Sequence, residues 1–181
     1  MRSFISVAAV VATTLVSSAA AAPWGNGLFW GNLNPNKCLN PHSAKYLVDA
    51  FGGLLSNYTT ANAEKYLADD LTDWSDSINF LAGQPLGNAT FPSKQAFEAG
   101  QGAQPAIPFE LLAIEAVTCD TIALRWKTGL QPEPVKGITI LKAENTKNNN
   151  DTWQIKTIYT EFNSASWVRD IGGNVTLPSY G

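Results

Sequence analysis

Four apolar segments near the C-terminal end decide the fold: FELLAIEAVT (109–118), TIALRWK (121–127), VKGITILKA (135–143) and WQIKTIYTEF (153–162). Each segment is rich in β-branched and aromatic residues, which favour strands. The breaks between them are short and polar, at Cys119-Asp120, at 131–134 and at 145–151. Four strands joined by short turns predict an antiparallel meander.

The chain before Pro108 has a helical pattern instead. Asn40-Pro41 predicts an N-cap followed by proline at the first helical position, and apolar residues recur every three or four positions over 44–58. Gly52-Gly53 lies within this helix and predicts a bend or a close approach of another element. Helices followed by a sheet, without alternation between the two, predict an α+β fold.

Shorter elements lie between this helix and the meander. The spacing predicts helices over 60–67 and over 93–100, the second with Ser93 as its N-cap, and a short strand over 77–81. The acidic segment 69–76 has no clear periodicity. We therefore expect an irregular, solvated turn there, in which Asp73 or Asp76 caps a backbone amide. Its acidic residues are Asp69, Asp70, Asp73 and Asp76.

The first 22 residues predict secretion. Met1-Arg2 is basic, 4–16 is apolar but too short to span a bilayer, and 17–22 consists of small residues of the kind that signal peptidase cleaves. Residues 23–37 predict an irregular arm, 38–172 a single domain and 173–181 a tail. No later apolar run is long enough for a membrane helix, so we expect no membrane association. The net charge of −3 makes a nucleic-acid partner unexpected.

Two cysteines, Cys38 and Cys119, are present. In an oxidising compartment they are expected to pair with each other, which would link the start of the helical half to the sheet half. Four Asn-X-Ser/Thr sequons predict N-glycosylation on exposed backbone. Their asparagines are Asn57, Asn88, Asn150 and Asn174.

Several site classes are not expected from this sequence. His42 is the single histidine, so a histidine-rich metal site and a two-histidine dehydratase site are excluded. There is no GxSxG segment for a serine hydrolase and no glycine-rich phosphate loop. We therefore expect no metal and no cofactor, which leaves carboxylates and phenols for proton chemistry.

The order of elements resembles the nuclear transport factor 2-like superfamily, a cystatin-like cone fold that includes SnoaL-like polyketide cyclases and ketosteroid isomerases. The phrases YLADDLTD (66–73), SDSINF (75–80) and WQI to YTEF (153–162) are similar to its fungal secreted branch. The resemblance spans Cys38 to Gly172. It implies a conical half-barrel, in which the N-terminal helices cap a curved antiparallel sheet and the concave side forms one ligand pocket.

Candidate pocket residues follow from strand alternation. If the face of the last strand that carries Trp153 is concave, Tyr159 and Glu161 project into the cone together. A bulge in this strand would turn Glu161 to solvent instead. In the first long strand Glu115 lies in apolar company, although pairing with Arg125 or Lys127 across the hairpin is an equal alternative.

The remaining wall and mouth of the expected pocket are aromatic and acidic. Trp126 is expected to form an aromatic wall, although Trp126 and Phe80 are also typical core residues. On the helical side the resemblance implies that Tyr66, Trp74, Asp76 and Phe80 form the mouth.

Three functions fit these features. The first is a secreted protein that binds a small, largely apolar molecule. The second is a cofactor-free isomerase or cyclase, with Glu161 or Glu115 as base and Tyr159 or Tyr66 as hydrogen-bond donor to an oxyanion. The third is an extracellular interaction or effector protein without a ligand. Because relatives often dimerise through the outer face of the sheet, a homodimer is a further expectation.

Overall fold

The computed structural model describes residues 37–147 and 150–176. The predicted signal peptide and the predicted arm as far as residue 36 lie outside the described residues. The elements are α1 (Pro41–Ser56), α2 (Thr60–Tyr66), β1 (Leu67–Trp74), α3 (Asp76–Leu81), β2 (Ala89–Phe91), α4 (Lys94–Gly102), β3 (Glu110–Val117), β4 (Thr121–Lys127), β5 (Lys136–Glu144), the short 3-10 helix η1 (Asn150–Thr152), β6 (Gln154–Phe162) and α5 (Ser164–Asp170).

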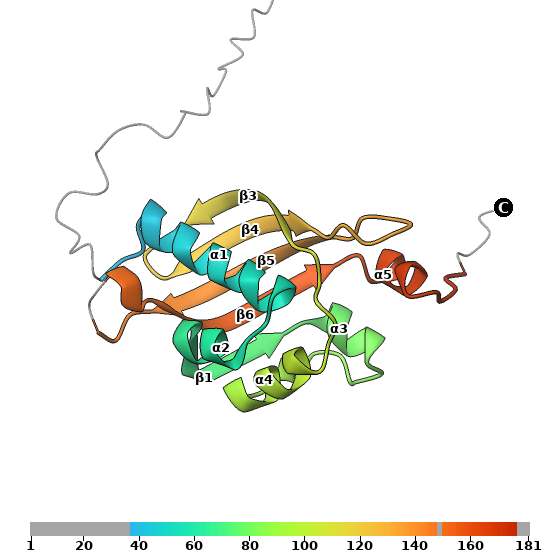
Figure 1. Ribbon diagram of the computed structural model, residues 1–181, viewed down its shortest axis with the longest axis horizontal. Coiled ribbons are helices and arrows are strands. Elements are labelled where there is room, and N and C mark those ends of the chain that lie inside the picture. Colours follow the sequence, from blue (N-terminus) through green and yellow to red (C-terminus); the bar gives the residue numbers. More distant parts are fainter. Residues whose placement is uncertain (1–36, 148–149, 177–181) are drawn as a thin grey trace, which may run out of the picture. The chain divides into compact units, whose positions relative to one another are not determined.

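One six-stranded sheet organises the fold, with the strand order β2-β1-β6-β5-β4-β3. Strands β3 to β6 form the predicted antiparallel meander. Strand β1 extends it by pairing parallel to β6, and β2 pairs antiparallel to β1 at the edge. Helices α1, α2 and α4 cover one face of the curved sheet, and α5 follows the end of β6 (Figure 1). The predicted α+β class, with helices capping a curved sheet, is confirmed.

Helix α1 begins as its sequence predicts. The side chain of Asn40 accepts hydrogen bonds from the backbone N–H groups of His42 and Ser43, and Pro41 occupies the first turn. Gly52 allows a close approach, because a Cβ there would lie 2.6 Å from Cδ1 of Phe109. The glycine in the middle of this helix therefore makes room for the start of the meander.

The core lies between α1 and the sheet. Helix α1 contributes residues at helical spacing, such as Leu47, Phe51 and Leu54, all of them buried. The meander contributes Ile122, Leu124 and Trp126 of β4, and further residues from β5 and β6. Burying such side chains stabilises the fold by about 1.5–3 kcal/mol each.

Two short elements differ from the sequence prediction. Segment 69–76, expected to be irregular, is mostly strand β1, because pairing with β6 outweighs the low strand preference of its aspartates. Segment 77–81, expected to be a strand, belongs to helix α3. The side chain of Ser75 caps this helix by accepting from the N–H of Ile78.

Cys38 and Cys119 form the predicted disulfide, which joins residues 81 positions apart. The backbone N–H of Leu39 also donates to the carbonyl of Cys119 at 2.9 Å. The start of α1 is therefore held at the β3–β4 turn by a covalent bond and a hydrogen bond. None of the helices in the described ranges has the length and apolar character needed to cross a membrane.

Candidate functional site in the cavity between helices and sheet

A cavity of about 250 Å³ lies between the helices and the concave face of the sheet. Its walls are mostly aromatic and aliphatic, and Ala82 and Gln104 are the exposed residues among them, so the cavity opens beside them. The lining residues are Phe51, Leu55, Asp73, Ile78, Leu81, Ala82, Phe91, Phe97, Gln101, Gln104, Ile107, Trp126, Ile158, Thr160, Phe162 and Trp167.

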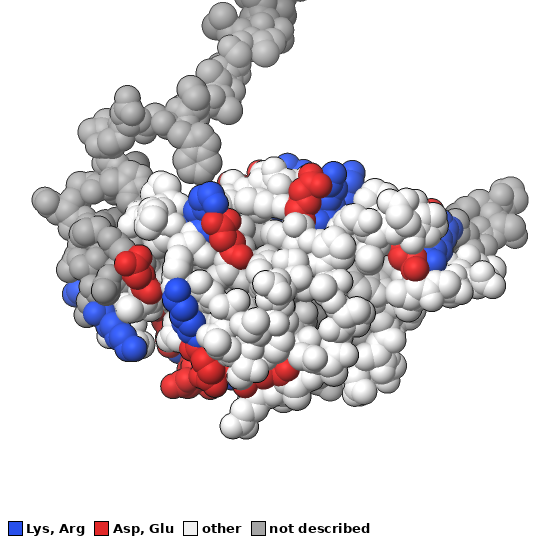
Figure 2. Space-filling view, viewed as in Figure 1, with Lys and Arg blue, Asp and Glu red and all other residues white. Residues whose placement is uncertain are grey.

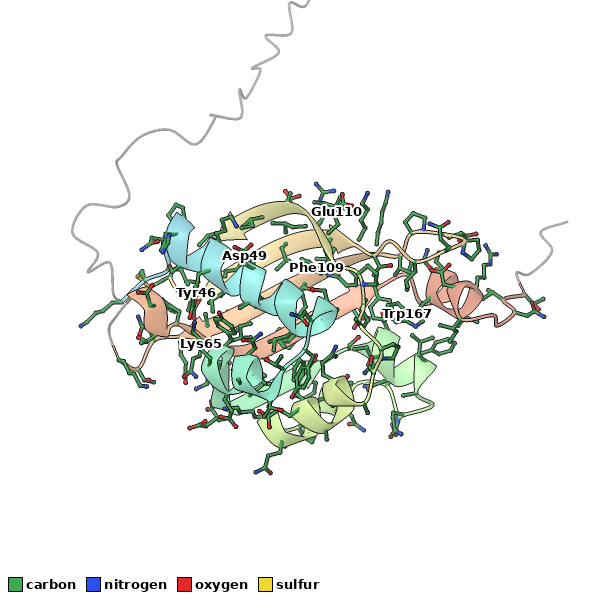
Figure 3. The ribbon with its side chains drawn as sticks, viewed as in Figure 1. Tyr46, Asp49, Lys65, Phe109, Glu110 and Trp167 are labelled. Atoms are coloured by element: carbon green, nitrogen blue, oxygen red, sulfur yellow. A yellow bond between two sulfur atoms is a disulfide. The ribbon has the colours of Figure 1, made fainter. Side chains whose placement is uncertain are left out.

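A chain of aromatic rings runs along one side of the cavity, and all of its members except Phe109 line the cavity. Phe51 contacts Phe109, and Phe109 contacts Trp126, with centroids 5.8 and 5.9 Å apart. The chain continues through Phe162 to Trp167 of α5, with centroid distances of 6.1 and 5.1 Å. Figure 3 labels two members of this chain, Phe109, which directly precedes β3, and Trp167 of α5. Such rings offer an apolar ligand large contact surfaces at fixed positions.

Among the described residues that line the cavity, only Asp73 has an ionisable side chain. It lies near the end of β1 and is 4% exposed, and its Oδ1 has no hydrogen-bond partner. Burial raises the pKa of the Asp73 carboxyl to about 7, and the negative charge of Glu161 adds to this rise. The backbone N–H of Trp74 acts in the opposite direction. Asp73 can therefore gain or lose a proton near neutral pH.

A second polar group faces the cavity next to Asp73. Asp73 pairs with Ile158 in the parallel β1–β6 ladder, so Thr160, two residues further along the same face, is its diagonal neighbour. The Thr160 hydroxyl is hydrogen-bonded to that of Thr139 at 2.8 Å, and the Trp126 indole N–H donates to Thr139, also at 2.8 Å. This buried chain fixes the Thr160 side chain on the cavity face, at the position diagonal to Asp73 in the β1–β6 ladder.

The structure corrects the predicted orientation of Tyr159 and Glu161. Lys142 of β5 pairs with Thr157 and Ala143 pairs with Ile155, so Lys156 is an extra residue in β6. Because strand side chains alternate, this bulge reverses the facing of every later position. Ile158 and Thr160 are buried, whereas Tyr159 is 45% exposed on the outer face.

Glu161 has a structural partner on that outer face. Its carboxylate accepts hydrogen bonds from the backbone N–H groups of Asp76 and Ser77, at 2.8 and 2.9 Å, and from the Ser77 hydroxyl. These donors lie in the first turn of α3, so Glu161 caps that helix. The alternative in which a bulge turns Glu161 away from the cone is the one observed.

Glu115 lies outside the cavity as well. Strand β3 has two bulges against β4, and Glu115 is the extra residue of the second. Its carboxylate forms an ion pair with Arg125, and both side chains are about half exposed. Of the two alternatives for Glu115, the structure contains the pair across the hairpin.

The residues predicted to form the mouth are dispersed. Trp126 lines the cavity, whereas Trp74 and Asp76 line a groove on the outer face of the sheet together with Tyr159 and Glu161. Phe80 is 62% exposed on α3. Tyr66 packs edge-on against Tyr46, 5.3 Å between centroids, with the Lys65 ammonium over both rings.

Asp73 itself was not predicted as a site residue. Asp69, Asp70 and Asp76 are exposed, as the expectation of a solvated acidic segment requires, but Asp73 is buried. The signal available in the sequence was the alternation of Leu71 and Asp73 with Thr72 and Trp74, which places Asp73 on the same face as a core leucine. In the ranges described, no three His, Cys, Asp or Glu side chains gather to hold a metal ion.

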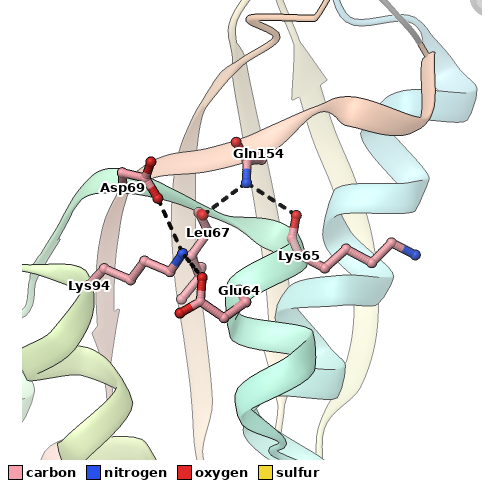
Figure 4. Close-up of polar contacts among 6 residues, drawn as sticks. All are labelled: Glu64, Lys65, Leu67, Asp69, Lys94 and Gln154. Atoms are coloured by element: carbon pink, nitrogen blue, oxygen red, sulfur yellow. Dashed lines mark hydrogen bonds and ion pairs between the residues drawn. The ribbon is translucent and has the colours of Figure 1, made fainter.

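Polar contacts hold α2 and α4 over this part of the sheet (Figure 4). The buried ammonium of Lys94 at the start of α4 contacts Glu64 of α2 at 2.7 Å and Asp69 of β1 at 3.4 Å. The Gln154 amide of β6 donates to the carbonyls of Lys65 and Leu67, at the junction of α2 and β1. These contacts fix the position of α4, which carries the cavity residues Phe97 and Gln101.

Two segments next to the cavity lack charged side chains. Residues 77–93 and 99–109 contain no charged side chain. Figure 2 shows the same pattern, with charged side chains around the periphery of the helical face and a broad uncharged area between them. The approach to the cavity therefore suits an uncharged ligand.

Comparison with known proteins identifies a matching family model and solved structures with a similar fold. The sequence model of a family described as the NTF2-like domain matches residues 37–174. A search of curated proteins finds no match. Among solved structures, IdmH of Streptomyces antibioticus, a candidate polyketide cyclase, is 11% identical with a TM-score of 0.52, covering 71% of this chain and 98% of its own.

Two further solved structures are similar to the same extent. A protein with a ketosteroid isomerase-like fold from Catenulispora acidiphila, in complex with trimethylamine, is 13% identical with a TM-score of 0.51 and covers 71% of this chain and 93% of its own. A candidate ketosteroid isomerase from Kribbella flavida is 10% identical with a TM-score of 0.50 and covers 77% and 84%. At these identities the similarity concerns the fold.

Proposed function

We propose that this chain, which belongs to the NTF2-like domain family, binds a small, largely apolar molecule in its interior cavity, with one polar end of that molecule against Asp73. The observation that carries the proposal is a single buried carboxyl group in a cavity with aromatic and aliphatic walls. Apolar cavities of about 150 Å³ in other proteins bind benzene. A cavity of about 250 Å³ therefore suits a ligand of one or two rings.

Binding can be tested with 2-naphthol, a neutral two-ring probe with one hydroxyl group. Because Trp126 and Trp167 line the cavity, its binding should change their fluorescence. Ala82→Phe at the opening should block it, and Ala61→Phe on the exposed side of α2 is the matched control. If the wild type does not bind the probe, or if both variants bind it equally, the cavity is not the binding site, and a ligand-free interaction protein becomes the better reading.

A second function, proton transfer without a cofactor, is favoured by the pKa of Asp73. A carboxyl with a pKa of about 7 can take a proton from a carbon next to a carbonyl group and return it to another position. The Thr160 hydroxyl, beside Asp73, is suited to donate a hydrogen bond to the oxygen of the resulting enolate. The broad reaction class is that of an isomerase or cyclase.

Proton transfer has its own assay. Incubation of 2-tetralone in heavy water with the wild type should exchange its acidic carbon-bound hydrogens for deuterium faster than buffer does, as followed by NMR. Asp73→Asn should reduce exchange to the buffer rate while 2-naphthol still binds. Unchanged exchange in Asp73→Asn would assign the activity to another group, and binding without any exchange would leave a carrier rather than an enzyme.

Secretion is part of the proposal. It is supported by the signal-peptide pattern of residues 1–22 and is compatible with the disulfide between Cys38 and Cys119. Expression of the full chain in a eukaryotic host should release it into the medium with an N-terminus near Pro23. Retention inside the cell with Met1 in place would contradict this.

A further inference from the structure

The outer face of the sheet carries a continuous row of apolar side chains. Trp74 pairs with Tyr159 across the β1–β6 ladder, and Tyr159 pairs with Ile140 across the β6–β5 ladder. All three are exposed, as is Ile138, which is 57% exposed. Large exposed apolar patches on soluble proteins usually have an occupant.

The row leads to a sequon at the edge of the sheet. Trp74 pairs with Ala89 of β2, and the residue before Ala89 is Asn88, the acceptor of the sequon Asn88-Ala89-Thr90. Asn88 is exposed and lines a groove of about 480 Å³ together with Trp74, Ile140 and Tyr159. Since neighbouring strands lie about 4.8 Å apart, Tyr159 is about 10 Å from the strand that carries the sequon. Sugars attached at Asn88 would begin at one end of this groove.

We propose that an N-linked oligosaccharide on Asn88 lies in this groove and covers the apolar row. The C–H faces of its first sugars would pack on the rings of Trp74 and Tyr159. Their hydroxyl groups would donate to the Asp76 carboxylate, which also lines the groove and already accepts from the Gly87 N–H. The groove thus has apolar rings that complement the C–H faces of a sugar and a carboxylate that complements its hydroxyl groups.

Attachment is a group transfer, which requires that the chain enter the secretory pathway, as residues 1–22 predict. A bond forms between Nδ2 of Asn88 and the anomeric carbon of the first sugar. The bond that breaks joins this carbon to the pyrophosphate of a lipid-linked oligosaccharide donor, and the amide nitrogen loses a proton.

The sequon threonine also has a structural role, and this determines which variant is informative. The Thr90 hydroxyl accepts from the N–H of Ser75 at 2.9 Å and donates to the Ser75 carbonyl at 3.1 Å. Replacing Thr90 would therefore disturb the β1–α3 connection as well as the sequon. Asn88→Gln changes an exposed residue and removes only the attachment point.

The test is hydroxyl-radical footprinting of the secreted protein, combined with glycopeptide mass spectrometry. We expect Asn88 to be occupied, and we expect oxidation of Trp74 and Tyr159 to rise severalfold in Asn88→Gln. Enzymatic removal of the sugar from the folded wild type should give the same rise. Asn57→Gln, at the exposed C-cap of α1, is the matched control and should leave both oxidation rates unchanged.

Three results would overturn the proposal. They are an unoccupied Asn88, an occupied Asn88 with equal oxidation of Trp74 and Tyr159 before and after sugar removal, and protection that persists in Asn88→Gln because a second copy covers the face. Size-exclusion chromatography with light scattering identifies the last case, in which wild type and variant are both dimers. If the sugar is the cover, the glycosylated protein should be monomeric.

Discussion

Replacing Asp73 by asparagine should change how stability depends on pH, and the size of the change follows from its burial. The carboxyl has an ordinary pKa of 3.8 in the unfolded chain and about 7 in the folded protein. The unfolded state therefore releases its proton first as pH rises. The stability contributed by the protonated form is complete below pH 3.8 and is lost as pH rises through 7.

Between pH 5 and pH 8 the expected loss is about 2.7 kcal/mol, that is about two pH units at 1.36 kcal/mol each. Asparagine has a similar shape but does not titrate, so Asp73→Asn lacks this loss. A constant cost for its buried amide, about 1–3 kcal/mol, applies at every pH. The free energy of unfolding of the variant relative to the wild type should therefore increase by about 2.7 kcal/mol from pH 5 to pH 8.

Urea unfolding with the disulfide intact, followed by tryptophan fluorescence at pH 5, 6, 7 and 8, measures this difference. Asp49→Asn, on the exposed side of α1, is the control, and its difference from the wild type should stay constant. A difference between Asp73→Asn and the wild type that is also constant from pH 5 to pH 8 would refute the raised pKa and, with it, the proton-transfer function.

Three other predictions test the fold. Cys38→Ser should lower the free energy of unfolding by up to about 4.5 kcal/mol, the loop-closure value for the observed separation of 81 residues, as measured in urea under non-reducing conditions. Glu161→Gln should lower the free energy of unfolding by about 1–2 kcal/mol because it weakens the cap of α3. Glu115→Gln, which removes an exposed ion pair, should lower it by less than about 1 kcal/mol. Equal losses of stability in the two variants would contradict the capping role of Glu161. Gly137→Ala should cost about 1–3 kcal/mol in thermal unfolding, since its Cβ would lie 2.4 Å from the Trp126 ring, and an unchanged melting temperature would show that the ring can move away.

The regular elements could be predicted because their signals are local. Asn40-Pro41 and the apolar spacing after it determine α1, and the cap and length observed match the pattern. The four apolar segments of the meander are separated by turns short enough to force antiparallel neighbours. In an oxidising compartment, two cysteines in the whole chain leave a single intramolecular pairing.

The candidate site was harder to predict because it depends on strand facing. The extra residue Lys156 reverses the alternation in β6, so Thr160 faces the cavity and Glu161 faces outward. The local sequence gives only an ambiguous signal of that bulge: the apolar residues change from Trp153 and Ile155 to Ile158 and Phe162, but Tyr159 fits the uninterrupted alternation equally well. Strand β1 posed a related problem, because its aspartates suggest a turn until pairing with β6 is known.

By itself, the amino-acid sequence determined the α+β class, the start of the first helix, the meander, the disulfide and the family resemblance, since each of these depends on residue type and spacing along the chain. The tertiary structure alone decided that Asp73 rather than Glu161 enters the cavity. The physical reason is that side-chain facing in a strand has a period of two, so one inserted residue reverses it. Where that residue is accommodated is decided by the pairing energy of β6 with β5 and β1, which are distant in sequence.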